Sequence, residues 1–355
     1  MKTPSLVVLL SLLTSPAFAG EASERAAAEL LDKKLKNENP EDLAILKAVQ
    51  GKEVIVVAGS MDHIEQVLSA ARIRHTVIQP NQVASADLTA QQILMVNCPG
   101  VMPMAGVRRI EKFVRAGGLL YTTDWALLNV VQKAFPGTIK HNGNSTGDHV
   151  TPVHVDARDD NLMSNLLLRP GQEPQWWLEG GSYPIEIIDP KKVRVLASSP
   201  QMARKYGAAP VVVRFRWDDG EVIHVVSHFY RQISTKGPAI AAKEAVNGIQ
   251  GLTEDQKAEF KNTAGSEASI GDVESSYAFQ KMTSNLVVGK QRRNVDLEKS
   301  YNMTPAAPIV LEGRKVEKGD RVKIISRKPR KKGNVVVRDD RGNEGEVPAA
   351  ALLAK

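Results

Sequence analysis

The chain has 355 residues, a formal charge of +7 and one cysteine, Cys98. A single cysteine excludes a disulfide within the chain, so stability must come from ordinary hydrophobic cores, and this length suits two or three domains. The charge is concentrated, since residues 314–341 hold twelve Lys/Arg against four Asp/Glu. Because the remainder is close to neutral, the composition argues against a nucleic-acid-binding role for the whole protein.

Residues 1–19 predict an export signal. Met1-Lys2 is a short positive start, Leu6–Leu13 is almost entirely apolar, and Ala17-Phe18-Ala19 is a small-x-small cleavage pattern. The apolar run is shorter than the about 20 residues that span a bilayer, and an uncleaved anchor is the alternative. We expect a bacterial periplasmic or secreted protein.

Residues 20–50 predict a helical lead-in, interrupted at Asn39-Pro40, that packs on the next domain. From residue 51 short apolar strands alternate with helices, which is typical of a parallel sheet covered on both faces. We therefore predict an α/β fold with a flavodoxin-like, doubly wound parallel sheet. The first four strands are expected at Val54–Ala58, Thr76–Ile78, Ile93–Val96 and Leu119–Thr122.

Later strands are expected at Val193–Leu196 and Val211–Trp217, and a turn at Asp218-Asp219-Gly220 leads into Val222–His228. We place the end of this domain at residue 233. Residues 234–309 are polar and predict a helical but loosely connected linker, with helices at Glu254–Asn262 and Val273–Val287. Short β-type runs in residues 310–355 predict a small β-barrel.

Residues 53 to about 230 resemble the class I glutamine amidotransferase-like superfamily, and within it the trehalose-utilisation-protein-like branch. The resemblance rests on the first strand, on Asn97-Cys98-Pro99-Gly100, on the helix-Gly117-Gly118-strand pattern, and on His228 after the turn at Gly220. It implies a catalytic cysteine in the turn after the fourth strand. That turn holds Asp124 and Trp125 here, so the usual chemistry of the superfamily is expected to be absent.

Three runs near the C-terminus, Lys318–Ile325, Gly333–Asp339 and Gly342–Pro348, resemble a bacterial SH3-like domain, although the tryptophan common in such domains is missing. The resemblance implies a module that binds a cell-envelope polymer or an envelope protein. The basic run Lys328-Pro-Arg-Lys-Lys332 is most simply a solvated loop. Binding of an anionic polymer or peripheral contact with a membrane surface is the alternative.

Asp124 and His228 are the candidate catalytic residues. Asp124 follows a parallel strand at the sheet edge where ligands bind, and His228 ends a later strand. The alternative for Asp124, which we favour, is an N-cap of the helix predicted over Trp125–Ala134. Cys98 is expected to be a small buried hydrophobe and not a nucleophile.

Five residues are candidate ligand contacts. Three follow or end strands, and two belong to an aromatic cluster that could equally be core: Ser60, Asn97, Trp125, Trp176 and Tyr183. We expect no metal site, because His149 and His154 do not have a metal-ligand spacing and would point to opposite faces of a strand. No cofactor is indicated either.

We therefore expect an exported, non-catalytic protein that binds a ligand or partner through an amidotransferase-like domain and an SH3-like envelope-binding module. The alternative is a hydrolase of a sugar or cell-envelope component that acts through Asp124 and His228. A third hypothesis, a structural subunit of an envelope complex, predicts a large exposed apolar patch on residues 236–309.

Overall fold

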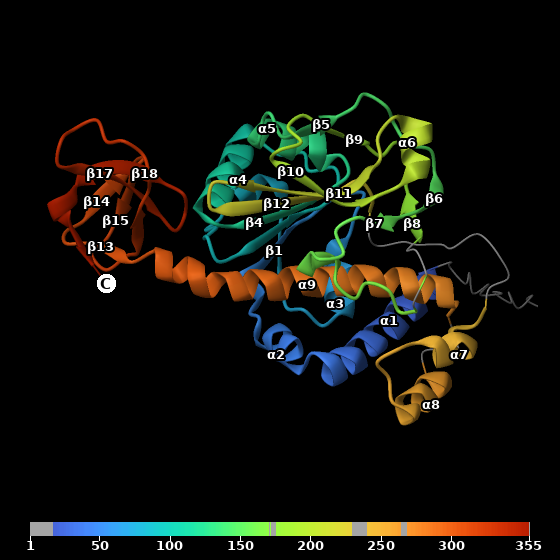
Figure 1. The fold of residues 1–355 in the computed structure, drawn as a ribbon. Coiled ribbons are helices and arrows are strands. Elements are labelled where there is room, and N and C mark those ends of the chain that lie inside the picture. Colours follow the sequence, from blue (N-terminus) through green and yellow to red (C-terminus); the bar gives the residue numbers. More distant parts are fainter. Residues whose placement is uncertain (1–16, 170, 172–174, 229–239, 264–267, 355) are drawn as a thin grey trace, which may run out of the picture.

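The computed structural model describes residues 17–169, 171, 175–228, 240–263 and 268–354 (Figure 1). They form a mixed α/β body on an eight-stranded sheet, followed by a smaller antiparallel sheet near the C-terminus. Most of the predicted export signal and the domain end predicted at residue 233 lie outside the described residues. No helix in the described part of the chain is both long and apolar enough to cross a membrane.

One half of the large sheet is parallel and contains the strands predicted from the sequence. Its order is β2-β1-β3-β4-β12, and each neighbouring pair runs parallel. The central strands β1, β3 and β4 are buried along their whole length, because helices cover both faces. The strands are β1 Val54–Val57, β2 Thr76–Ile78, β3 Ile93–Val96, β4 Leu119–Thr123 and β12 Gly220–Val225.

The other half is antiparallel, so the sheet is mixed where the sequence predicted a parallel one. Beyond β12 it continues through β11 Pro210–Trp217, β10 Val193–Ser198 and β7 His154–Val155. The predicted hairpin between β11 and β12 is present, with Trp217 paired to Gly220. Two small two-stranded antiparallel sheets lie outside the large sheet: β5 Ile139–His141 with β9 Ile185–Ile187, and β6 His149–Pro152 with β8 Gln175–Leu178.

Helices lie on both sides of the large sheet (Figure 1). On one side α4 Met104–Ala116 buries an apolar stripe and ends, as predicted, at Gly117, whose φ of +124° favours glycine. Short helical segments follow two of the strands. The π-helical turn Leu127–Val131 and α5 Gln132–Ala134 come after β4, and α6 Pro200–Tyr206 comes after β10. On the opposite side lie α3 Ile64–Ala70, α1 Ala17–Glu38 and α9 Ile270–Ser300.

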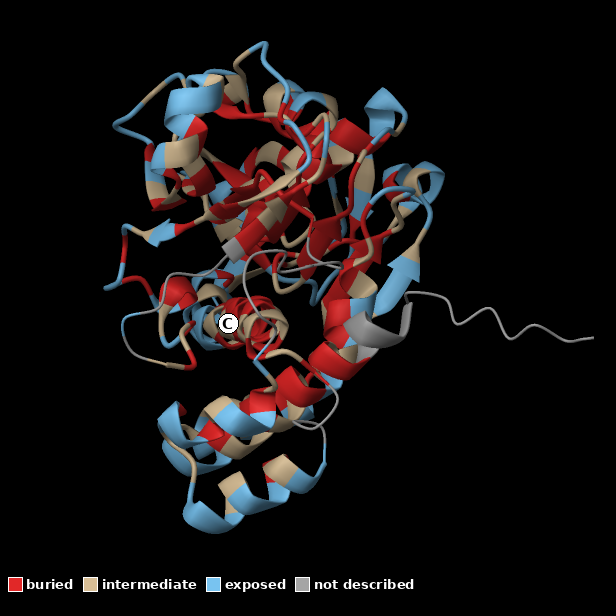
Figure 2. Cartoon of the chain, turned by 90° about the vertical axis from the view of Figure 1, so that its right-hand side faces the viewer, coloured by how far each residue is buried: buried red, intermediate tan, exposed pale blue. Residues whose placement is uncertain are grey.

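Helix α9 is the largest departure from the sequence prediction, which expected a shorter helix, Val273–Val287, with loose connections. It is 31 residues long, and about half of its residues are buried between the large sheet and α1 (Figure 2). Polar residues on it are buried because they have partners. The Lys290 ammonium donates to the carbonyl oxygens of Ala90 and Gly117 at 2.5 and 2.7 Å, and burial lowers the pKa of Lys290 to about 7.

The N-terminal helices pack mainly on α9, whereas the predicted lead-in was expected to pack on the domain that follows it, residues 51–233. Helix α1 ends and α2 Pro40–Ala48 begins on either side of Asn39, where the sequence predicted the break. The Gln280 amide of α9 donates to the carbonyl oxygen of Glu24 at 3.0 Å. In sequence, α7 Ala242–Ala245 and α8 Glu254–Asn262 lie between β12 and α9, and α8 has the predicted bounds.

The C-terminal module, residues 301–354, is antiparallel and starts earlier than the boundary predicted at residue 310. Its sheet has the order β18-β17-β16-β13-β19, and β14 pairs with β15 beside it. The first strand, β13, precedes residue 310 and pairs with the last strand of the chain. The strands are β13 Met303–Pro305, β14 Ile309–Leu311, β15 Arg314–Val316, β16 Val322–Ile324, β17 Asn334–Asp339, β18 Glu344–Pro348 and β19 Leu352–Ala354.

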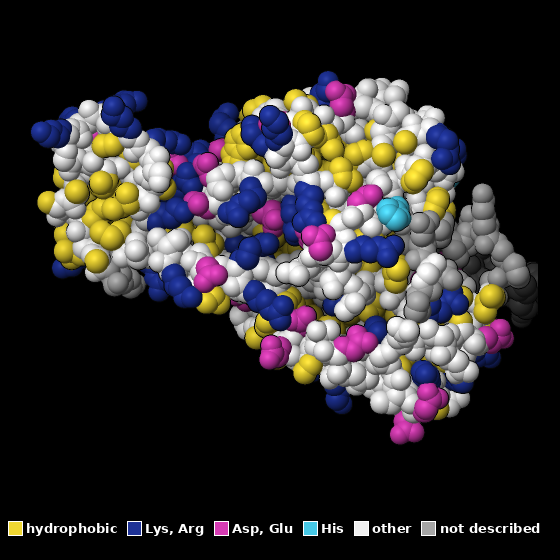
Figure 3. Space-filling model, viewed as in Figure 1, with side chains coloured by type: hydrophobic (Ala, Val, Ile, Leu, Met, Phe, Trp, Pro, Cys, Tyr) yellow, Lys and Arg dark blue, Asp and Glu magenta, His cyan; other side chains and the backbone are white. Residues whose placement is uncertain are grey.

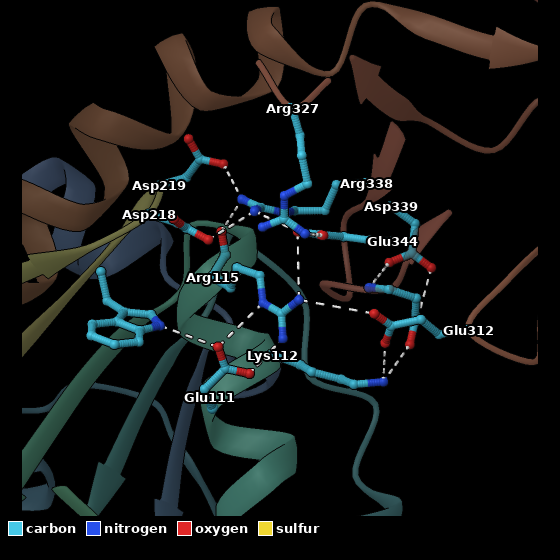
Figure 4. Close-up of polar contacts among 12 residues, drawn as sticks. Glu111, Lys112, Arg115, Asp218, Asp219, Glu312, Arg327, Arg338, Asp339 and Glu344 are labelled. Atoms are coloured by element: carbon cyan, nitrogen blue, oxygen red, sulfur yellow. Dashed lines mark hydrogen bonds and ion pairs between the residues drawn. The ribbon is translucent and has the colours of Figure 1, made fainter. Parts of the chain in front are cut away.

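A charge cluster docks the C-terminal module on the large sheet (Figure 4). The buried guanidinium of Arg338 donates to Asp218 at 2.8 Å and Asp219 at 2.7 Å, both in the turn between β11 and β12. It also donates to Glu344 of its own module at 2.6 Å. A buried arginine with three carboxylate partners is a specific contact, so the module is held in place.

A second contact joins the module to the loop before β3 and to α4. The backbone amide of Ala90 donates to the carbonyl oxygen of Asp340 at 2.7 Å, and Arg341 pairs with Asp87 at 2.5 Å. Gly342 lies so close to α4 that an added Cβ would be 2.0 Å from the carbonyl oxygen of Lys112. Only a residue without a side chain fits this position.

We expect Gly342→Ala to loosen the docking, because it adds a clash to the cost of a left-handed backbone. The matched control is Gly313→Ala, since both glycines have φ near +80° (+85° and +81°) but nothing lies within 4 Å of a Cβ at Gly313. Gly342→Ala should cost about 1–3 kcal/mol more than the control, the usual cost of overpacking. Urea unfolding measures the difference. Equal costs for the two variants would show that the contact does not support the fold.

Candidate functional site

Asp124 follows β4 directly, at the carboxyl end of the parallel strands. Its φ of +43° is in the left-handed region, which is strained for a residue other than glycine. Backbone hydrogen bonds hold Asp124 in this conformation. Its amide donates to the carbonyl oxygen of Val225 in β12, and its carbonyl oxygen accepts from the Leu127 amide, each at 2.8 Å. A sharp strand-to-helix turn of this kind presents its side chain at the sheet edge.

The Asp124 carboxylate does not cap the following helix, so the interpretation that we favoured from the sequence is wrong. The helical turn after it has no side-chain cap. Instead the carboxylate accepts the Tyr183 backbone amide at 2.8 Å and the Ser182 hydroxyl at 3.1 Å. These donors come from the loop after β8, far away in sequence.

His228 lies beside Asp124, so the two candidate catalytic residues are brought together. Its Nε2 is 3.1 Å from Asp124 Oδ2, and its Nδ1 contacts the carboxylate of Glu179. Asp124, His228 and Glu179 therefore form a continuous chain of acid, imidazole and acid. Strand β12 ends at Val225, so His228 lies in the turn after the strand and not at its last position.

The pKa of His228 reflects this environment. Burial alone would lower it, but contact with Asp124 and with Cys98, together with the charge of Asp62, raises the pKa of His228 to about 11. The ring is therefore an imidazolium at neutral pH and balances the carboxylates on either side of it. Asp124 is 2 % exposed and His228 is 1 % exposed, so this balance occurs almost without solvent.

Cys98, in the turn after β3, is the third group beside Asp124. Its Sγ is 3.9 Å from Asp124 Oδ2, and its backbone amide donates to Thr123 Oγ1 at 3.1 Å. The Thr123 hydroxyl in turn donates to the buried Asp62 at 2.6 Å. Cys98 is buried, as expected, and this burial raises the pKa of its thiol.

An aromatic stack borders the carboxylate. The Tyr183 ring stacks on Trp125 with centroids 5.3 Å apart, and on His141 with centroids 4.0 Å apart. Trp125 Nε1 donates to the carbonyl oxygen of Gly181 at 2.7 Å. Trp125 and Tyr183 are only partly buried, so of the predicted ligand contacts these two combine exposure with closeness to Asp124.

The other predicted ligand contacts have different surroundings. Trp176 is fully buried against Phe279 of α9, with ring centroids 4.7 Å apart, and belongs to the core. Asn97 is buried and bonded to the start of α3, where it accepts from the Ile64 amide and donates to Glu65. Ser60 is exposed in the loop after β1.

The remaining histidines do not join the site. His224 is fully buried, 2.8 Å from Thr122 Oγ1, and burial lowers its pKa to about 3. His149 contacts the carbonyl oxygen of Gly147, and His154 lies exposed on β7. Two cavities lie elsewhere: one of about 630 Å³ between α9 and the sheet, and one of about 1060 Å³ beside α1.

Sequence reasoning missed Glu179 and Ser182. Glu179 follows the short strand β8 and precedes Gly180-Gly181, a turn signal that marks the end of the strand. This signal could have drawn attention to an acid at a strand end. Nothing local indicates that the acid meets His228.

No protein-family model matches the chain, and no curated protein matches it. Similar solved structures include an exo-β-1,4-mannosidase from Opitutaceae bacterium strain TAV5, with 12 % identity, a TM-score of 0.36 and coverage of 54 % of this chain and 33 % of that one. A putative GMP synthase subunit from Thermoplasma acidophilum has 12 % identity, a TM-score of 0.42 and coverage of 71 % and 98 %. A β-galactosidase from Bacillus circulans sp. alkalophilus has 12 % identity, a TM-score of 0.38 and coverage of 85 % and 41 %. The chain thus spans less than half of either glycosidase.

We expect Asp124 and His228 to be strongly coupled in stability, because removing either one leaves the other charge buried without its neighbour. In a double-mutant cycle of Asp124→Asn and His228→Asn, measured by urea unfolding with a chelator present, the coupling should be roughly 1–3 kcal/mol. The control cycle pairs Asp124→Asn with His154→Asn, which is exposed on β7. Its coupling should be within about 0.5 kcal/mol of zero. Additive effects in the first cycle would contradict the pairing.

Proposed function

We propose that this protein is an exported, non-catalytic binding protein of the cell envelope, in which the C-terminal module contacts an anionic envelope polymer. The proposal combines the export signal predicted over residues 1–19 with a basic loop of the module. The observation that carries it is a set of four basic side chains for which the described part of the chain shows no ion pair.

These four side chains lie in the loop between β16 and β17. Lys328, Arg330, Lys331 and Lys332 are exposed, and within the described part of the chain no ion pair joins them to an acid. The loop backbone is nevertheless fixed, because Glu346 accepts the amides of Arg330 and Lys331 at 2.9 and 2.7 Å. Glu346 lies near Arg330, but the four positive charges exceed it, so the loop keeps a net positive charge that suits a polyanion.

Several other basic residues of the module are already paired within the protein. Arg338 and Arg341 bind Asp218, Asp219 and Asp87 in the docking contact. Figure 3 shows lysine and arginine side chains at the upper left end of the module, away from the large sheet. A charged surface that faces away from the docking contact remains accessible to a partner.

The fold assignment that accompanies this proposal is a flavodoxin-like, amidotransferase-like domain with an SH3-like module. It is supported by the parallel order β2-β1-β3-β4-β12, which is the flavodoxin-like order 2-1-3-4-5. The position of the superfamily's cysteine is taken by Asp124. Because both Asp124 oxygens bind protein donors and the residue is 2 % exposed, the site favours a non-catalytic role.

We expect reversal of the four loop charges to Glu to weaken binding to purified peptidoglycan sacculi roughly tenfold or more, since each basic residue near an anionic surface contributes about 1 kcal/mol. The control reverses Lys133, Lys191, Arg204 and Lys205, which have the same composition and are exposed on the α/β body. Co-sedimentation at low and high salt measures the effect, and the wild-type interaction should weaken with salt. Equal losses of binding in both variants would show that binding depends on the net charge of the protein and not on this loop. A preference for anionic vesicles over sacculi would make a membrane surface the partner.

A second candidate function is hydrolysis of a sugar or envelope component, and it is favoured by the strained Asp124 beside the His228–Glu179 pair. In this alternative Asp124 attacks or orients the substrate, and His228 transfers protons. The test is turnover of a panel of glycosides and acylated sugars by the wild type, by Asp124→Asn and by a control, Asp148→Asn. The alternative requires a loss of about 100-fold or more in Asp124→Asn only. Absence of turnover by the wild type contradicts it.

A further inference from the structure

Three donor atoms of different chemistry meet at the carboxyl ends of β3, β4 and the turn after β12. They are Cys98 Sγ, one carboxylate oxygen of Asp124 and one ring nitrogen of His228, and all lie within 4.8 Å of one another. Two of the separations are 3.1 Å, between His228 Nε2 and Asp124 Oδ2, and 3.9 Å, between Cys98 Sγ and Asp124 Oδ2. All three residues are buried.

These distances suit ligands of one small cation. Zinc lies about 2.0–2.3 Å from sulfur, nitrogen and oxygen ligands, so neighbouring ligands of a tetrahedral ion lie roughly 3–4 Å apart. A thiolate, an imidazole and a carboxylate are the donor types that zinc-class ions accept, whereas magnesium and calcium prefer oxygen alone. We propose that Cys98, Asp124 and His228 form a binding site for a divalent zinc-class metal ion.

An independent observation supports the proposal. Although both ring nitrogens of His228 are buried near carboxylates, neither has a partner in hydrogen-bond geometry. Buried polar atoms are rarely left in this condition, and each exception calls for a cause. An ion placed among Cys98, Asp124 and His228 would displace the proton that Nε2 carries in the metal-free protein and would supply the missing partner for this nitrogen.

The residues around the three donors have the arrangement of a supporting shell. Glu179 lies at Nδ1 of His228, on the far side of the ring from the proposed ion. A carboxylate in this position orients a metal-binding histidine and fixes its tautomer. Ser182 and Tyr183 hold the Asp124 carboxylate, and Thr123 holds the backbone of Cys98.

Three protein ligands leave the fourth position to water or to another small donor, as in zinc sites that act on a ligand. The proposal does not depend on the envelope-binding function, because the site lies in the large α/β body and the basic loop in the C-terminal module. It also explains how the only cysteine of the chain is used without a disulfide.

Cobalt(II) is the probe for this site, because it replaces zinc and its absorption reports thiolate ligation. The chelator-treated full chain should bind one equivalent of Co²⁺ with a thiolate-to-cobalt charge-transfer band, and Zn²⁺ should abolish this band. Cys98→Ser should lose the band while keeping its circular dichroism spectrum, which separates loss of a ligand from loss of the fold. The control His149→Gln should bind as the wild type does.

A substitution in the supporting shell gives a second measurement, a change in the affinity for Co²⁺. Glu179→Gln should keep the band but weaken the affinity for Co²⁺ by about 10–100-fold, as is usual when the partner of a metal-binding histidine is changed. Its matched control is Glu186→Gln, an exposed glutamate on β9. The proposal is overturned if the wild type shows no charge-transfer band, or if the band persists in Cys98→Ser. In either case the cluster is an ion pair without a metal.

Discussion

The contact between Asp124 and His228 holds together the part of the molecule that carries its candidate chemistry. The two residues follow adjacent parallel strands, β4 and β12, and each is nearly inaccessible to solvent. Neither charge could be buried there alone, because an uncompensated ion in a protein interior costs several kcal/mol. Glu179 adds the loop after β8 to the same cluster, and Ser182 and Tyr183 close that loop on Asp124. Charge balance thus fixes three separate chain segments.

Local patterns in the sequence were sufficient to predict the framework of the fold. Alternating apolar runs gave the parallel strands, Gly117-Gly118 gave the end of α4, and Asp218-Asp219 gave the β11–β12 turn. Asp124 was found because it occupies a strand end. The groups that donate hydrogen bonds to Asp124 were not predicted. Tyr183, whose amide donates to it, lies 59 residues away, and no local signal encodes such a contact. The sequence predicted a shorter helix than α9, with loose connections, because a one-dimensional pattern does not show the partners of buried residues such as Lys290 and Gln280.

The C-terminal module is joined to the α/β body by charged groups and by a small apolar cluster of Ala90, Ala116 and Tyr301. Arg338 lies between the β11–β12 turn and β18, and Gly342 allows the module to approach α4 without a side chain in the way. The predicted picture of a module on a loose linker is replaced by a module in a fixed position. The apolar patch expected of a structural subunit is also missing from the described part of residues 236–309, where Ile240 and Val295 are the exposed large hydrophobics.

The packing of α1 on α9 has a consequence for the order in which the chain can fold. Gln280 and Glu24 are in contact although 256 residues separate them. At about 5–20 residues per second, synthesis of the intervening chain takes on the order of ten seconds or more. For all of this time the apolar face of α1, including Ala26, Ala27 and Leu30, lacks the helix that covers it. The apolar face of α1 therefore cannot be covered until α9, which lies in the last quarter of the chain, has been made.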